Sequence, residues 1–336
     1  MDLPYLTASL PGIGGVLRAS PEDFFVDEEP AYEPAGSGDH VFVRIEKRNL
    51  TTPQAVERIA RALDVKARDV GVAGMKDRHA VTRQWLSLPP PVTPEAVRPL
   101  ALDDIAIVEV ARHPHKLRTG HVRANRFVLC VRDVVPDAEA RARAIFDALA
   151  TGAPNWYGEQ RFGREGDNAE RGLALLRGER LKDRKLARLL VSALQSQLFN
   201  QWLVARMADG LWARVLAGDI LHKLGGGLFT CEDPVVDERR LLAGELVITG
   251  PMFGVKMRRP TGEAAAREDS ILTAAGLAVE EFGAVAAIAE GTRRDASIIV
   301  GDPRVRAVAP TVLEVAFTLP GGAYATAVMR ELMKIG

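Results

Sequence analysis

The sequence predicts an α+β fold organised in two domains. Its 336 residues exceed the size of one ordinary hydrophobic core, so two cores are expected. Strand-like runs dominate both ends of the chain, whereas helix-like periodicity dominates the middle. This order indicates a helical domain inserted into a β-containing one. We therefore expect one domain from 1–152 together with 299–336, and a second domain from 153–298.

Besides the two strand-like runs that flank residue 77, four strands and three helices are expected before residue 153. The alternation of apolar and polar residues is clearest in the second strand, Val41–Glu46. Thr51 precedes Thr52 and Pro53, an order typical of a capped helix start. The expected strands are 24–28, 41–46, 105–110 and 127–131, and the expected helices are 51–63, a short one from Thr93-Pro94, and 137–149.

The middle of the chain is predicted to be helical. Apolar residues recur at helical spacing along 183–208, which indicates a long helix that packs in a core. Three glycines, Gly225–Gly227, predict a turn within a small β segment more readily than a phosphate-binding loop. The expected helices are 167–177, 183–208, 238–247, 262–288 and, after a strand at 313–319, 323–334.

Composition restricts the class of protein. A hydrophobic content of 47% with 26% charged residues is typical of a folded soluble chain. Lys plus Arg (44) equals Asp plus Glu (44), so net charge does not indicate nucleic-acid binding. The segment Val110–Arg132, however, contains six Lys or Arg residues and no acidic residue. It could follow phosphates, or nearby acids from the N-terminal segment could offset it.

Cysteine use and hydropathy indicate a cytoplasmic protein. Cys130 and Cys231 are too few for a disulfide framework or a thiolate metal site, which fits a reducing compartment. No apolar run approaches the length of a membrane span, and the N-terminus lacks a signal pattern. His113, His115 and His121 have no acidic or thiol neighbour in sequence, so we expect no metal site there.

Asp77 occupies the most informative stretch of the chain. A short apolar run, Val70–Ala73, precedes Gly74, and a run with strand-like alternation, Ala80–Leu88, follows. Asp77 is thus expected in a tight connection between two strands, with cationic neighbours in sequence. Nearby cations favour an ionised carboxylate, which can act as a nucleophile or a base. A solvated turn without chemistry is the alternative.

The stretch Gly74–Gln84 resembles the Gly-x-Lys-Asp-Arg-x-Ala-x-Thr-x-Gln signature of the TruD family of tRNA pseudouridine synthases. The aspartate of that signature is the family's catalytic residue, so the resemblance implies a catalytic role for Asp77. Arg18 and Lys76 are our candidates for the cation that keeps Asp77 ionised.

Further stretches resemble the same family. Phe24 matches its N-terminal aromatic that contacts the target nucleotide, and Asn125 and Phe127 match its second motif. Tyr324 matches an aromatic that lines the pocket, and Asn155–Gly163 matches the entrance to the inserted domain. Without the resemblance, the aromatic residues would be interpreted as core and Asn125 as a turn residue.

The resemblance implies both fold and reaction. The catalytic domain is expected as a mixed, largely antiparallel sheet flanked by helices, and the inserted domain as the second wall of a cleft for tRNA. The reaction would isomerise uridine 13 without redox change, so no cofactor or metal is expected, and we expect a monomer. Candidate phosphate contacts in the inserted domain are Arg161, Arg164, Lys182, Arg184 and Lys185.

Two other functions stay open from the residues alone. The chain could bind RNA without catalysis, with Asp77 as a structural turn residue. It could also be a nucleotide-dependent enzyme that uses the glycine-rich residues 11–16, although no strand leads into that segment.

Overall fold

The computed structural model describes residues 3–335 and confirms the α+β fold. The chain forms two compact units. The sheet unit comprises Ser9–Leu149 and the chain from Ile299 onward, and the inserted unit comprises Ala150–Ile298 with the N-terminal residues up to Ala8. The first boundary thus lies three residues before the expected one, and the N-terminal residues up to Ala8 group with the inserted unit.

A nine-stranded sheet forms the core of the sheet unit. Its main order is β14-β15-β7-β2-β5-β3-β6, with β1 added on β7 and β4 on β5. Among the strand pairings within residues 3–335, that of β2 with β5 is parallel and the others are antiparallel, as expected. The elements of this unit are β1 (Gly14–Leu17), β2 (Phe24–Pro30), β3 (His40–Arg48), α1 (Thr52–Ala62), β4 (Gly71–Val72), β5 (Val81–Leu88), α2 (Pro94–Val97), β6 (Ile105–His113), β7 (Val122–Val134), α3 (Ala138–Ala148), β14 (Gly301–Ala309), β15 (Val312–Pro320) and α8 (Ala325–Met333).

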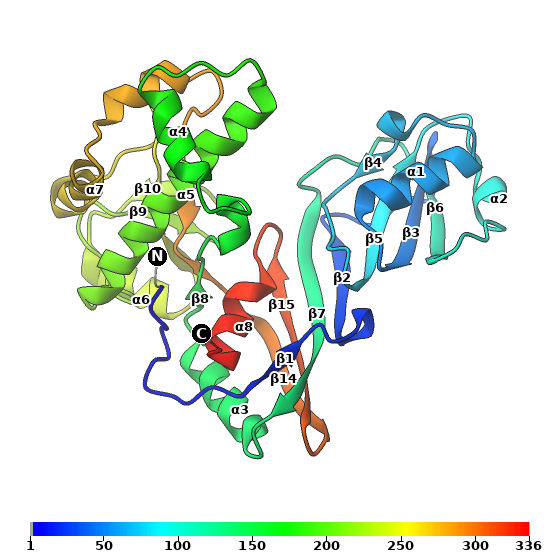
Figure 1. Cartoon of the computed structure of the whole chain (residues 1–336), viewed down its shortest axis with the longest axis horizontal. Helices are drawn as coiled ribbons and strands as arrows, with labels where there is room; N and C mark the ends of the chain where they lie inside the picture. The colour runs from blue at the N-terminus through cyan, green and yellow to red at the C-terminus, as the bar shows by residue number, and fades with distance from the viewer. Residues whose placement is uncertain (1–2, 336) are drawn as a thin grey trace. The chain divides into compact units, whose positions relative to one another are not determined.

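The thirteen-residue strand β7 joins the two halves of this sheet, as Figure 1 shows. It pairs with β2 on one side and with β15 on the other. Phe127 therefore lies opposite Val26 on β2 and opposite Phe317 on β15. Segments that lie far apart in sequence meet here, and they include the stretches that carry Phe24 and Asn125.

Helix α1 forms as its sequence predicted. Thr51 Oγ1 accepts the backbone N–H of Gln54 at 3.3 Å, and the Gln54 side chain accepts the N–H of Thr51 at 2.9 Å. This reciprocal cap satisfies backbone donors that the first turn leaves free. The buried face of the helix, which includes Val56 and Ile59, packs in one apolar cluster with β3 and β5. The helix start is thereby fixed beside the end of β3.

The inserted unit combines helices with a small sheet. We expected mostly helix, and the structure adds a four-stranded sheet in the order β10-β9-β11-β12, in which the predicted glycine turn joins β9 to β10. The elements are β8 (Ala153–Pro154), α4 (Asn168–Leu176), α5 (Arg184–Ala208), β9 (Ile220–Lys223), β10 (Leu228–Thr230), α6 (Pro234–Leu242), β11 (Leu246–Met252), α7 (Gly262–Ala274), β12 (Thr292–Asp295) and β13 (Ser297–Ile298). The 3-10 helices within residues 3–335 are Pro21–Asp23, Ala67–Asp69, Glu159–Phe162 and Val279–Val285.

Two helix predictions in this unit were wrong. Instead of a helix over 238–247, α6 runs from Pro234 to Leu242 and the buried strand β11 begins at Leu246. Instead of a helix over 262–288, α7 ends at Ala274. In both cases a glycine with positive φ, Gly244 (73°) or Gly276 (64°), follows the helix end and terminates it.

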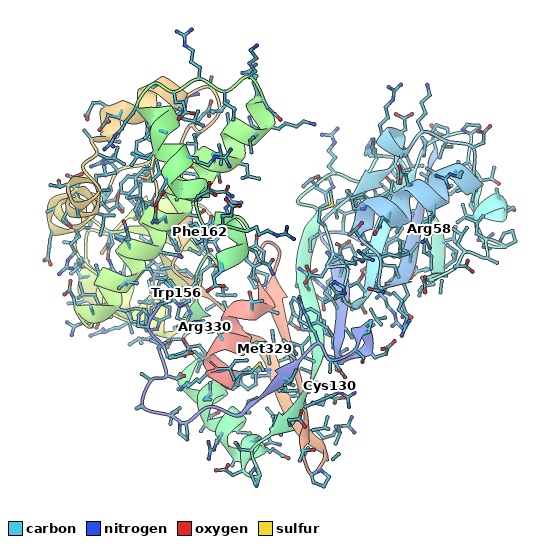
Figure 2. The ribbon with its side chains drawn as sticks, in the orientation of Figure 1. Arg58, Cys130, Trp156, Phe162, Met329 and Arg330 are labelled. Carbon is cyan, nitrogen blue, oxygen red and sulfur yellow. The ribbon has the colours of Figure 1, made fainter. Side chains whose placement is uncertain are left out.

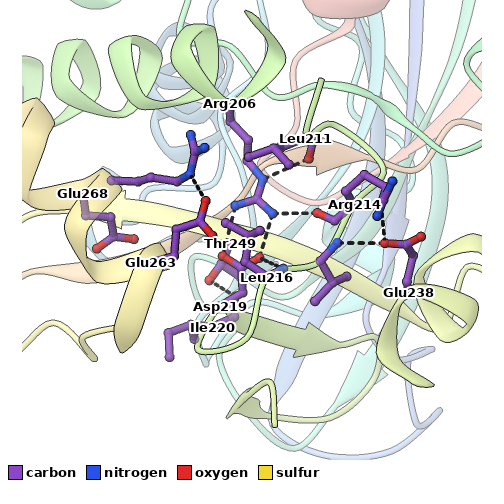
Figure 3. Close-up of polar contacts among 12 residues, drawn as sticks. Arg206, Leu211, Arg214, Leu216, Asp219, Ile220, Glu238, Thr249, Glu263 and Glu268 are labelled. Carbon is purple, nitrogen blue, oxygen red and sulfur yellow. Dashed lines mark hydrogen bonds and ion pairs between the residues drawn. The ribbon is translucent and has the colours of Figure 1, made fainter. Parts of the chain in front are cut away.

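A buried ion pair stabilises the inserted unit, as Figure 3 shows. The guanidinium of Arg206 donates to both carboxylate oxygens of Asp219, at 3.0 and 2.7 Å. It also donates to the backbone carbonyls of Leu211 (3.1 Å) and Arg214 (2.8 Å). Because the two charged side chains are only 3% and 5% exposed, their hydrogen bonds replace those that water would make. The pair fixes the end of α5 to the chain that leads into β9.

Neither cysteine forms a disulfide. Cys130 is half-buried on β7 (Figure 2), and Cys231 is buried in the inserted unit. In the part of the chain that the structure describes, no helix combines the length and apolar character needed to cross a bilayer. Within residues 3–335, no group of three or more His, Cys, Asp or Glu side chains is arranged to hold a metal ion.

Candidate active site

Asp77 lies in the connection between β4 and β5, as the sequence predicted. Its side chain is 55% exposed, so a ligand can reach it from solvent. One carboxylate oxygen, Oδ2, accepts a hydrogen bond from Nη2 of Arg18 at 2.6 Å. The contact spans 59 residues of sequence and joins the end of β1 to the loop of the family signature. Arg18 is thus the cation that pairs with Asp77.

Arg18 is itself held in an unusual position. Its backbone φ is 65°, in the left-handed region that residues with a Cβ seldom occupy. Its guanidinium carbon lies 4.0 Å from the centroid of the Phe24 ring, which places the cation over an aromatic face. Backbone strain of this kind concentrates at functional sites, because the surrounding contacts must enforce it. Phe24 therefore orients the arginine that contacts Asp77.

Buried polar side chains hold the Asp77 loop from beneath. Lys76 Nζ pairs with Glu28 rather than with Asp77, and the backbone N–H of Lys76 donates to Thr52 Oγ1 at 2.9 Å. Lys47 Nζ donates to the backbone carbonyl of Asp77 at 2.9 Å. Lys76, which we expected as a possible partner of the Asp77 carboxylate, instead anchors the loop to β2. Neither Glu28 nor Lys47 was selected from the sequence.

Burial shifts the pKa of two of these groups. Desolvation raises the pKa of the Glu28 carboxyl, although the Lys76 ammonium opposes that shift. Desolvation also lowers the pKa of the Lys47 ammonium to about 8, while the negative charge of Asp77 acts in the opposite direction. The charges of Glu28 and Lys76 cancel when both groups are ionised. The ammonium of Lys47 therefore adds a positive charge beneath the loop.

Asn125 lies directly opposite Glu28 in the β2–β7 pairing. Opposite residues of an antiparallel pair point to the same face of the sheet, so Asn125 belongs to the same polar group. It is 9% exposed, and its side-chain oxygen is buried without a hydrogen-bond partner among residues 3–335. A buried acceptor of this kind gains a hydrogen bond when a ligand brings a donor.

The predicted aromatic residues differ in exposure. Phe24 and Phe127 are 2% and 6% exposed, and their rings meet edge to face with centroids 6.3 Å apart. Phe127 also stacks on Phe317 at 5.4 Å, so its ring forms part of the core of the sheet. Tyr324, by contrast, precedes α8 and is 53% exposed. The preceding strand, β15, places Leu319 opposite Asn125, at the end of the sheet that carries the polar group.

Strand phase is the signal that could have identified the missing residues. On β3, Lys47 is in phase with the buried residues Val41, Val43 and Ile45. On β2, Glu28 is in phase with Phe24. Side chains two residues apart point to the same face, so each charged residue continues an inward-facing row. A charge at such a position is costly without a partner, which makes it a candidate for a site.

The basic stretch is only partly offset by acids. Arg123 pairs with Glu29, and Arg132 pairs with Asp23, as the alternative interpretation expected. Lys116 Nζ donates to the backbone carbonyl of Arg68 at 3.1 Å. Because a carbonyl carries no net charge, this contact does not neutralise the lysine. In the inserted unit, Arg161 donates to Ser196 at 3.1 Å and to Ser192. The other candidate phosphate contacts are exposed: Arg164, Lys182, Arg184 and Lys185.

Comparisons with known proteins identify the family of the chain. The family model of tRNA pseudouridine synthase D (TruD) matches residues 1–182 and 180–332. A tRNA pseudouridine synthase D of Anaeromyxobacter sp. (strain Fw109-5) is 52% identical over 348 residues, covering 100% of this chain and 97% of the relative. One from Thermus thermophilus is 42% identical over 335 residues, covering 99% of this chain and 92% of the relative.

A solved structure has a similar fold. It is a crystal structure titled as putative tRNA pseudouridine synthase D (TruD) from Methanosarcina mazei. The TM-score is 0.83 at 24% sequence identity, and the match covers 100% of this chain and 99% of that one. At this identity the likeness shows a shared fold.

Proposed function

Because the chain belongs to the TruD family of tRNA pseudouridine synthases, we propose that it converts uridine 13 of tRNA to pseudouridine, with Asp77 as the catalytic carboxylate. Family membership makes the chain a pseudouridine synthase. The uridine position and the roles of individual residues are the proposed part, and they rest on the signature around Asp77 and on its surroundings.

The reaction is an isomerisation. The bond between C1′ and N1 breaks, the base turns, and a bond between C1′ and C5 forms. The proton on C5 leaves and N1 gains one, so atoms and electrons balance within the nucleotide. Asp77 could attack the base or the sugar covalently, or it could remove a ribose proton. Both routes need an ionised carboxylate held in place.

The pair between Arg18 and Asp77, on a loop fixed by buried polar side chains, is the observation that carries this proposal. A solvated turn would need neither a strained arginine nor Lys47 beneath the main chain. Arg18 binds the carboxylate through Oδ2, so the second oxygen, Oδ1, can face a ligand. Preorganised groups of this kind lower the cost of reaching the transition state.

The other predicted residues would act on the displaced uridine. A base in folded RNA must leave its stack before its glycosidic bond can be reached. Asn125 would accept a hydrogen bond from the base edge or from a ribose hydroxyl through its buried side-chain oxygen. The exposed ring of Tyr324 would cover a face of the base, and Phe24 and Phe127 would support the pocket from the sheet.

An unmodified tRNA transcript tests the proposal. The parent, Asp77→Asn and Asp103→Asn would each be incubated with it, and pseudouridine would be mapped by position. Asp103 is an exposed aspartate of the same unit and serves as the matched control. We expect modification at uridine 13 by the parent and by Asp103→Asn only. A transcript with cytidine at position 13 should give none, and modification elsewhere would overturn the assigned position.

Three further properties remain predictions: that the protein is a monomer, that it acts in the cytoplasm, and that it needs no metal or cofactor. Dialysis against a chelator followed by the same assay would test the last part, because a required metal or nucleotide would then have to be added back.

A further inference from the structure

Lys47 is a fully buried lysine that follows a row of buried apolar residues on β3. It continues the inward row of β3 and is 0% exposed. On the neighbouring strands its backbone lies opposite Ile105 of β6 and Thr82 of β5, neither of which carries a charge. The ammonium donates to the carbonyl of Leu50 and, at 2.9 Å, to the carbonyl of Asp77.

Burial of this ammonium is costly, because a buried charge normally requires a paired charge or a metal. The hydrogen bonds of Lys47 within residues 3–335 go instead to two backbone carbonyls. A residue such as methionine would fill the same space without the desolvation cost. The two hydrogen bonds to carbonyls must therefore offset the desolvation cost of the ammonium. One of these carbonyls belongs to Asp77, whose carboxylate is exposed.

The contacts around Asp77 divide into two kinds. Arg18 holds its carboxylate from the exposed side, at 2.6 Å. Lys47 holds its main chain from the buried side. Thr52 holds the preceding N–H, that of Lys76. Of these contacts, the one from Lys47 acts on the backbone of Asp77 itself. It therefore limits rotation of the peptide group next to the Asp77 side chain.

We propose that Lys47 is a positioning residue that holds Asp77 in its reactive orientation by binding its backbone carbonyl. The inference rests on the proposed function of Asp77. Lys47 is not a catalytic residue, because its complete burial keeps it from the substrate. A displacement of about 1 Å in a reacting group can cost roughly a hundredfold in rate, so a contact that fixes the main chain can be decisive.

The charge of Lys47 adds a pH dependence to this role. The charged groups that act on it are Asp77, which favours its ammonium form, and Lys76, which disfavours it. The flanking residues of its own strand are engaged elsewhere, Glu46 with Arg83 and Arg48 with Glu22. As pH rises through the Lys47 pKa of about 8, the amine loses its charge while its N–H groups still donate. The hold on Asp77 should weaken without being lost.

Kinetics of Lys47→Met test the inference. We expect kcat per folded protein to fall roughly ten- to hundredfold at neutral pH, with KM for tRNA unchanged within about threefold, because no exposed contact is removed. The ratio of parent to variant kcat should shrink as pH rises above the Lys47 pKa of about 8. Lys47→Arg keeps a permanent cation and should retain part of kcat with no alkaline decline.

Arg206→Met is the matched control. It also removes a buried cation that binds backbone carbonyls, but its contacts lie within the inserted unit. We expect it to lower stability and to leave kcat per folded protein near that of the parent. A kcat for Lys47→Met within about twofold of the parent, or a ratio that stays constant with pH, would overturn the inference.

Amide hydrogen exchange provides a readout that does not depend on activity. Lys47→Met should speed exchange at residues 76–79, because the loop loses a tether, and Arg206→Met should not. If the parent forms no pseudouridine, the proposed function is wrong and the exchange result alone decides whether Lys47 holds the loop. Unchanged exchange at 76–79 would refute the positioning role.

Discussion

Two arginine–aspartate pairs, one in each unit, share their chemistry and differ in nearly everything else. Arg18 and Asp77 meet through one contact of 2.6 Å, with side chains 27% and 55% exposed. Arg206 and Asp219 meet through two contacts, with side chains 3% and 5% exposed. The guanidinium of Arg206 is further occupied by carbonyls, as Figure 3 shows, whereas Asp77 stays open to solvent.

The difference between the two pairs follows from their burial. An exposed pair contributes little to stability because water screens it, so stability does not account for its presence. A buried pair costs desolvation, and removing one partner leaves the other charge stranded. The inserted-unit pair therefore fixes structure, whereas the sheet-unit pair leaves the carboxylate of Asp77 open to solvent.

The largest expected effect is on activity, from Asp77→Asn. We expect pseudouridine formation to fall by at least about a hundredfold, because the amide cannot act as a base or nucleophile. The free energy of unfolding should change by no more than about 1 kcal/mol. Turnover assays and urea denaturation measure the two quantities. A large stability loss would mean that the two pairs are alike and that Asp77 is structural.

The reverse outcome is expected for Asp219→Asn. Loss of this carboxylate strands a buried guanidinium and should lower the free energy of unfolding by about 3–5 kcal/mol. Glu263→Gln is the control in the same unit, because Glu263 pairs with Arg267 at an exposed site and should change stability by less than about 1 kcal/mol. If urea denaturation gives the same loss of unfolding free energy for both variants, burial does not determine how much an ion pair contributes to stability.

Phe127 tests whether a core position can also serve the site. Phe127→Ala should lower the free energy of unfolding by about 3–5 kcal/mol because the ring packs on Phe317. Phe127→Leu keeps most of the apolar volume and should cost less than about 1.5 kcal/mol. If the ring supports the displaced base, Phe127→Leu should still lower kcat per folded protein and retain tRNA binding. If Phe127→Leu has the same kcat per folded protein as the parent, Phe127 serves the core and not the site.

The basic stretch should influence binding rather than chemistry. Replacing Lys116 and Arg118 by glutamate should weaken binding of all tRNAs to a similar extent and reduce the slope of log affinity against log salt by about 1–2. Filter binding over a range of salt concentrations measures the slope. Arg132→Glu is a useful comparison because Arg132 already pairs with Asp23. An unchanged slope for Lys116 and Arg118 would show that these charges do not meet phosphate.

The last prediction is a pH dependence of stability from Lys47. Its pKa is about 8 in the folded chain against 10.5 for an ordinary lysine. Between these values the unfolded chain binds the extra proton, so stability rises with pH. Relative to Lys47→Met, the parent should gain free energy of unfolding as pH rises from about 8 towards 10.5. A constant difference in urea denaturation across this range would contradict the lowered pKa.

Local sequence was sufficient for much of the sheet unit. Alternation located β2, β3 and β5, and the hydroxyl cap with its early proline located α1, because these signals depend on neighbouring residues alone. The same local order placed Asp77 between two strands. Local signals failed over 238–288, where the expected helices overran the glycines that end α6 and α7.

By itself, the sequence determined the fold class, the loop of Asp77 and the resemblance that suggested its role. Only the tertiary structure decided that Arg18 rather than Lys76 contacts Asp77, that Lys47 binds its carbonyl, and that Phe127 is buried. The physical reason is that alternation shows which way a side chain points but not which distant side chain it meets. That depends on how β2, β5 and β7 align, which the packing of the whole sheet sets.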